Sequence, residues 1–146
     1  MFNLKPEDRI SEWRNFRKTI HHLDRMDMLT KTTDLWINAP LVNHYLDMDS
    51  CEHWPDPWKL LVDNMYCDAA RALGMFYTLF LTERFDKRDL EVVIYKNNSG
   101  YETALVVCEK YALNIMYQDV VNTTSINRTD VYRTFNATDL NAVNYL

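Results

Sequence analysis

Apolar residues recur at three- and four-residue steps along the first part of the chain, which is the period of an amphipathic helix. A helix is predicted over residues 6–23, where Pro6 suits the first turn and Glu7 and Asp8 complement the amino-terminal dipole. A second helical pattern covers residues 25–38 and ends before Pro40, whose ring disfavours helical geometry at the preceding residue. The stripe of the first helix consists of Ile10, Trp13, Phe16, Ile20 and Leu23.

The strongest helical pattern spans residues 65–82 and predicts a helix with a broad buried face, which Asp63 or Asn64 would cap. A short helix is predicted just before it, from Pro57 or Trp58 through Val62, with Asp56 as its cap. The apolar face of the longer helix consists of Tyr66, Ala69, Ala70, Leu73, Phe76, Tyr77, Phe80 and Leu81.

After Asp89 the period changes to two, and segments 91–95, 101–108 and 111–117 are predicted to be strands joined by turns at 97–100 and 109–110. In the third strand alternate residues predict one buried and one wet face, and residues 119–122 extend or follow it. The fold class expected is α+β, with amino-terminal helices followed by a small antiparallel meander packed on the 65–82 helix.

The chain of 146 residues has the size of one domain, assigned here to residues 1–121. Segment 122–146 has spaced apolar residues among many Asn, Thr and Asp, so we expect it to be extended and to lie along its own domain or a partner. Its aromatic residues Tyr132, Phe135 and Tyr145 are candidate partner contacts.

Composition excludes several function classes. A net charge of −5 is unsuited to a nucleic-acid binder, and we interpret the local basic run Arg14-Asn-Phe-Arg17-Lys18 as a solvated helix face. Only 2 glycines are present, so no glycine-rich phosphate loop is expected. Three cysteines without a CxxC pair suggest reduced thiols. Neither a signal peptide nor a membrane-spanning stretch is expected.

Cys67 is the residue with the clearest chemical possibility, because a thiol in the first turn of a helix is favoured as a thiolate. An enzyme would need a base, His53 or His44, and a carboxylate to orient it, Asp47, Asp49 or Asp56. The set chosen for this alternative is Cys67, His53 and Asp56. The other interpretation of Cys67 is a small apolar residue packed near the helix start.

The segment Tyr66-Cys-Asp-Ala-Ala-Arg-Ala-Leu-Gly74, followed by a meander of strands, resembles the transglutaminase-like, papain-related fold over about residues 54–121. In active members a His on the next strand and an Asp on the one after follow the Cys. Here the strand from Tyr101 to Val107 has no His, and all four histidines precede Cys67. The resemblance therefore implies an inactive relative.

Trp54-Pro-Asp-Pro-Trp58 predicts a rigid corner whose two tryptophans cover the core, or an aromatic ledge for a partner chain. The nearby Cys51-Glu52-His53 lacks the paired spacing of structural zinc sites, so no metal and no other cofactor is expected.

The function expected from these observations is binding to other proteins without catalysis. The sequence WPDPWKLL…YCDAARALGMFYTLF, with a later KYALN, resembles that of small proteins of tailed bacteriophages. That resemblance implies a virion or assembly component, located in the virion or the host cytoplasm, with virion subunits or its own copies as partners. The alternatives are a cysteine-dependent acyl transferase or amide hydrolase centred on Cys67, and a protein that binds one regulatory host partner.

Overall fold

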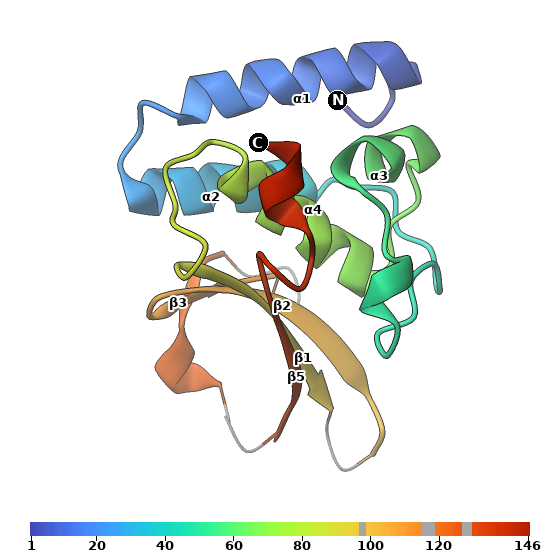
Figure 1. The fold of residues 1–146 in the computed structure, drawn as a ribbon, viewed down its shortest axis with the longest axis vertical. Coiled ribbons are helices and arrows are strands. Elements are labelled where there is room, and N and C mark those ends of the chain that lie inside the picture. Colours follow the sequence, from blue (N-terminus) through green and yellow to red (C-terminus); the bar gives the residue numbers. More distant parts are fainter. Residues whose placement is uncertain (97–98, 115–118, 127–129) are drawn as a thin grey trace.

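The computed structural model describes residues 1–96, 99–114, 119–126 and 130–146, and it confirms the α+β class. A layer of helices covers one face of an antiparallel sheet (Figure 1). The elements described are α1 (Pro6–Ile20), α2 (Arg25–Trp36), α3 (Pro57–Asp63), α4 (Asp68–Phe80), β1 (Leu90–Lys96), β2 (Glu102–Cys108), β3 (Tyr111–Leu113), β4 (Val121–Asn122) and β5 (Val131–Asn136). Short 3₁₀ turns lie at Cys51–His53 (η1), Thr123–Ser125 (η2) and Ala142–Tyr145 (η4).

The first three helices begin where the sequence predicts. α1 begins at Pro6. The carboxylate of Asp24 caps α2 by accepting a hydrogen bond from the Asp27 amide at 2.9 Å. Asp56 caps α3 as predicted, accepting from the Lys59 amide at 2.8 Å. Among the helices of the described residues, none has the length and apolar character needed to span a membrane.

The start of α4 differs from the prediction of residue 65. Asn64 ends α3 in the left-handed conformation, with φ of 50°. Tyr66 then forms a parallel bridge with Leu41, and its amide donates to the Pro40 carbonyl at 3.3 Å. Since this backbone is extended, the helix begins only at Asp68, with Cys67 as its N-cap. Neither Asp63 nor Asn64 caps it.

α4 is the central element of the fold, and every residue from Ala69 to Phe80 is buried. α2 packs on one side of it and the sheet, mainly β2, on the other (Figure 1). A helix buried all round is typical of a domain core, which explains why its sequence is nearly continuously apolar.

The sheet has the strand order β4-β3-β2-β1-β5. β1 and β2 form the predicted hairpin, with Leu90 opposite Cys108 and Lys96 opposite Glu102. The predicted third strand is described only as far as residue 114, and residues 115–118 lie outside the described part. In its described part Ala112, Leu113 and Asn114 are all buried, so the expected alternation with a wet face is not seen there.

The last segment of the chain returns to the sheet. β5 pairs with β1 along the edge, with Phe135 opposite Val92. The following turns bury Leu140 and Ala142, and η4 lies over α4 (Figure 1). The Tyr145 ring contacts the Tyr77 ring of α4 edge to face, with 6.0 Å between centroids.

One hydroxyl joins three helices in the core. Thr78 of α4 accepts hydrogen bonds from the indole nitrogens of Trp13 in α1 at 2.9 Å and Trp36 in α2 at 2.8 Å. Its own hydroxyl donates to the Gly74 carbonyl at 2.7 Å. A hydroxyl has one donor and two acceptor positions, so the bonding capacity of Thr78 is fully used.

Gly74 provides the space for this arrangement. A Cβ built on Gly74 would overlap three atoms of the Trp36 ring, so only a glycine allows the indole to reach Thr78 across α4.

Replacing Thr78 by Val should leave both indole N–H groups without an acceptor inside the core. We expect the free energy of unfolding to fall by about 2–6 kcal/mol, because each of the two buried unsatisfied donors costs about 1–3 kcal/mol. Urea unfolding monitored by tryptophan fluorescence measures this. Thr78→Ser is the matched control, since it keeps the hydroxyl and should cost about 1 kcal/mol for the lost methyl group. Equal losses in the two variants would contradict the role of the hydroxyl.

Candidate active site

Cys67 occupies the N-cap position of α4, with φ of −79° and ψ of 179°. Its Sγ lies 3.4 Å from the backbone nitrogen of Leu46, which donates a hydrogen bond to it. The side chain does not cap the helix, and the backbone amides of residues 68–70 make no hydrogen bond to another described residue. Free N–H groups at a helix start attract negative charge, so the thiol faces an electropositive backbone.

A cavity of about 290 Å³ lies beside Cys67. Loop 43–48, the start of α4 and the start of β2 enclose it. Its lining residues are Asn43, His44, Leu46, Asp47, Met48, Cys67, Asp68, Tyr101 and Glu102. Cys67 is only 6% exposed and is one of the residues that line this cavity.

The residue after Cys67 fastens the helix start to the sheet. Asp68 Oδ2 accepts hydrogen bonds from Thr103 Oγ1 and from the Ala104 amide, both at 2.7 Å. Its other oxygen, Oδ1, lies 3.2 Å from Asn114 Nδ2 and 3.4 Å from Arg71 Nη2. All of these partners donate, so the carboxylate is satisfied on both oxygens.

Asn114 completes this network behind Cys67. It follows β3 in the left-handed conformation, with φ of 72°, and is 4% exposed. Its amide nitrogen donates to the Ala104 carbonyl at 2.7 Å, and its oxygen accepts from Arg71 Nε at 2.5 Å. β2, β3 and α4 are therefore held together at the point where the cavity opens.

The alternating pattern of residues 111–117 predicts Asn114 to be part of a strand, and no motif in the sequence indicates a role for Asp68, Arg71 or Thr103. The one available signal is the spacing of Asp68 and Arg71, two charged residues three apart in an otherwise apolar helix. Charged residues in a buried stretch require partners, but the sequence does not say which.

The histidines and acids considered as partners of Cys67 lie in different places. His44 and Asp47 line the Cys67 cavity. His53 ends η1 with a side chain 81% exposed, near Glu52, and is not among the lining residues. Asp56 uses its carboxylate to cap α3. Asp49 meets Arg133, which donates to its backbone carbonyl at 2.9 Å.

The start of β2, where the transglutaminase-like pattern expects a His, carries other side chains. Tyr101 is 59% exposed, Glu102 pairs with Lys96 at 3.2 Å, and Thr103 bonds to Asp68. Within the described ranges no group of three His, Cys, Asp or Glu side chains is placed to hold a metal ion.

The candidate partner-binding aromatics mostly contact their own domain. Trp54 donates from its indole to the Asp47 carbonyl at 2.7 Å, and its ring lies 5.0 Å from that of Phe135. Trp58 packs on Trp13 with 5.8 Å between centroids. Tyr132 on β5 is 45% exposed.

The other two cysteines, Cys51 and Cys108, have thiols that are harder to ionise than an ordinary cysteine thiol. Burial, with a smaller contribution from Glu109, raises the pKa of Cys108 to about 12. Burial and the neighbouring Glu52 also raise the pKa of Cys51. Both are therefore poor nucleophiles at neutral pH, since the thiolate is the reactive form.

Comparison with solved structures identifies which α+β fold the chain has. The chain superposes on calcium-bound Legionella pneumophila LapG with a TM-score of 0.73 at 14% identity, covering 92% of this chain and 77% of LapG. The fold is transglutaminase-like. A second LapG structure gives a TM-score of 0.73 over 90% of this chain and 76% of LapG, also at 14% identity. EGTA-treated LapG gives a TM-score of 0.66 at 13% identity, over 90% of this chain and 74% of LapG.

No protein-family model and no curated protein sequence matches the chain. The resemblance inferred from Tyr66–Gly74 and the meander is thus confirmed at the level of the fold. The structural likeness to LapG extends over 92% of this chain, well beyond the segment 54–121 that carried the sequence resemblance. The matched structures come from a bacterium and give no support to the resemblance to bacteriophage proteins.

Replacing Asp68 by Asn should destabilise the helix start. Both Asp68 oxygens accept hydrogen bonds, so the NH₂ group of the new amide would face donors instead of acceptors. We expect a loss of about 1.5–3 kcal/mol in the free energy of unfolding, the usual value for a hydrogen bond to a charged group. Chemical denaturation measures it. Asp34→Asn on the exposed face of α2 is the matched control and should change stability by less than about 0.5 kcal/mol. A similar small change in both variants would show that the network contributes little.

Proposed function

We propose that this protein is a cysteine-dependent amide hydrolase or acyl transferase with Cys67 as its nucleophile. The observation that carries the proposal is the position of Cys67: the start of the central helix of a transglutaminase-like fold, facing a cavity that a histidine also lines. This is the helix position at which active members of that fold have their cysteine.

His44 is the proposed general base. It lines the same cavity as the sulfur, and it comes from loop 43–48 and not from β2. The site therefore differs from the family arrangement in the element that supplies the imidazole, while the nucleophile keeps its place. Asp47, three residues on and lining the same cavity, is the carboxylate proposed to orient the ring.

The proposed reaction follows from these groups. His44 takes the thiol proton, and the Cys67 thiolate attacks the amide carbonyl to form a tetrahedral oxyanion. Free backbone amides at the start of α4 would stabilise that oxyanion. The C–N bond breaks, the amine leaves with the proton from His44, and a thioester remains. Water, or an acceptor amine, gives a proton to His44 and attacks the thioester, which restores the thiol.

A second candidate is the non-enzymatic binding protein, possessing the same fold without catalysis. The observation that favours it is the start of β2, where Tyr101, Glu102 and Thr103 stand in place of the family histidine. Under this proposal the exposed Tyr132 and the edge strand β5 would receive a protein partner, such as a virion subunit or a second copy.

Alkylation by iodoacetamide at neutral pH tests the choice between them. An enzyme should be labelled first at Cys67, ahead of Cys51 and Cys108, as read by peptide mass spectrometry. Removing the base by His44→Gln should slow labelling of Cys67 about tenfold, because an adjacent imidazole increases the thiolate fraction.

His53→Gln is the matched control for this experiment, because its exposed side chain lies away from the cavity and its loss should leave the labelling rate unchanged. An inert Cys67 would exclude the enzyme and leave the binding protein. Equal rates in the His44 and His53 variants would reject His44 as the base.

A further inference from the structure

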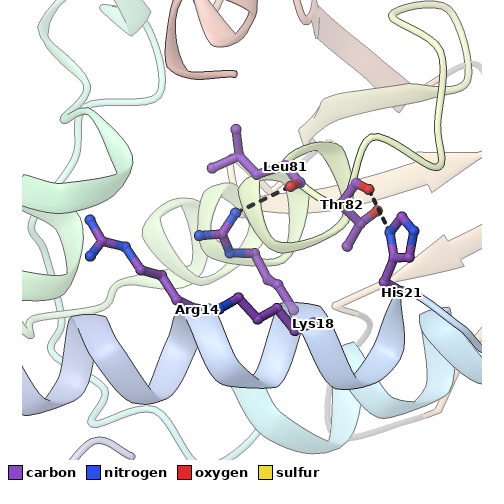
Figure 2. A pocket seen from close by; sticks show the side chains of 6 residues that line it. Arg14, Lys18, His21, Leu81 and Thr82 are labelled. Atoms are coloured by element: carbon purple, nitrogen blue, oxygen red, sulfur yellow. Dashed lines mark hydrogen bonds between the residues drawn. The ribbon is translucent and has the colours of Figure 1, made fainter.

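A second pocket, of about 300 Å³, lies at the other end of α4 (Figure 2). It is formed by the second half of α1 and the residues that follow α4. Its lining residues are Arg14, Arg17, Lys18, His21, Leu81 and Thr82. Four of the six can carry positive charge and none is acidic, although the whole chain has a net charge of −5.

The spacing of the basic residues explains why they converge. Positions 14, 17, 18 and 21 follow the three- and four-residue steps of one helix face. In Figure 2, Arg14, Lys18 and His21 extend from α1, with His21 beside Thr82 and the Arg14 side chain running along the helix away from Leu81 and Thr82. The basic run that the sequence suggested to be a solvated surface therefore lines a concave site.

Two of these residues are held by the end of α4. Arg17 Nη1 donates to the Leu81 carbonyl at 3.2 Å, and His21 Nδ1 lies 2.9 Å from the Thr82 carbonyl (Figure 2). A carbonyl only accepts, so Nδ1 carries the hydrogen. Hydrogen-bond donors are favoured beside the free carbonyls at a helix carboxyl end, which accounts for Arg17 and for the Nδ1 hydrogen of His21. It does not account for Arg14 and Lys18, which bond to neither carbonyl.

The guanidinium groups are also fixed by aromatic rings. Arg17 lies over the Trp13 ring at 4.2 Å from its centroid, and Arg14 lies over the Trp58 ring at 5.1 Å. Stacking of this kind holds a guanidinium in place without neutralising it. The side chains are thus arranged before any ligand arrives, which reduces the entropy lost on binding.

Among the residues that the structure describes, the three cations of this pocket, Arg14, Arg17 and Lys18, have no ion-pair partner. The buried Nε of Arg17 has no acceptor. Burial, together with the charge of Arg14, lowers the pKa of Arg17 to about 10. The cations therefore repel one another, and an anion between them would relieve that repulsion.

We propose that this pocket binds a phosphate group, presented by a small phosphomonoester or as free phosphate. Two arginines and a lysine match the two negative charges and several acceptor oxygens of that group better than the single charge of a carboxylate. The pocket is separate from the proposed active site: Cys67 and Leu81 flank the 13 residues of α4, a length of about 20 Å at 1.5 Å per residue.

Titration of the full chain with inorganic phosphate, followed by amide chemical shifts in nuclear magnetic resonance, tests the proposal. We expect saturable shifts at residues 14–21 and 81–82, with a Kd of about 1 mM or below. The double variant Arg14→Gln/Lys18→Gln should bind at least about tenfold more weakly. Lys31→Gln/Lys110→Gln makes the same change in net charge at exposed sites elsewhere and should bind as the parent does.

Two further arms separate the sources of the signal. Glycerol phosphate should bind at the same residues if phosphomonoesters are ligands, whereas free phosphate alone would bind if the site is too closed for a substituent. Acetate should bind at least about tenfold more weakly than phosphate. Linear shifts without saturation, equal weakening in both double variants, or acetate binding as tight as phosphate would each overturn the proposal. None of these readouts depends on Cys67.

Discussion

The hydroxyl of Thr78 is the contact on which the helical layer depends. It receives the indole N–H groups of Trp13 and Trp36 and donates to Gly74, so α1 and α2 are both tied to α4 through one oxygen. Large aromatic side chains are buried here, but the hydroxyl determines where they sit, because a buried indole N–H without an acceptor is costly. This makes α4 a fixed axis, with its sides covered by helices and sheet.

Because α4 is held in place, the residues at both of its ends have defined positions. At the amino end, Asp68 binds the sheet through Thr103 and Ala104, which holds Cys67 at the edge of a cavity. Past the carboxyl end, the carbonyls of residues 81 and 82 orient Arg17 and His21 of α1. The helix dipole has the opposite sign at the two ends, so the start of α4 attracts negative charge and its end attracts positive charge.

Much of the fold follows from local sequence, and the site does not. The Asp56 cap and the 6–23 pattern are local, so they were predictable within a few residues. The start of α4 was misplaced because a bridge between Leu41 and Tyr66, distant in sequence, keeps the chain extended. Likewise, β5 pairs with β1 across some forty residues, and Asn114 finds its partners on α4. That His44 and not His53 lines the cavity depends on the irregular loop 43–48, for which no periodic pattern exists.

The central functional claim is that Cys67 and His44 act on the same substrate in one cavity. A crystal structure of the full chain after reaction with a peptidyl chloromethyl ketone tests it most directly. We predict a covalent bond to Cys67 Sγ, the peptide in the cavity beside Asp47 and Met48, and an imidazole nitrogen of His44 within about 3–4 Å of the sulfur. An unmodified Cys67, or a modified one with the His44 ring turned out of the cavity, would contradict it.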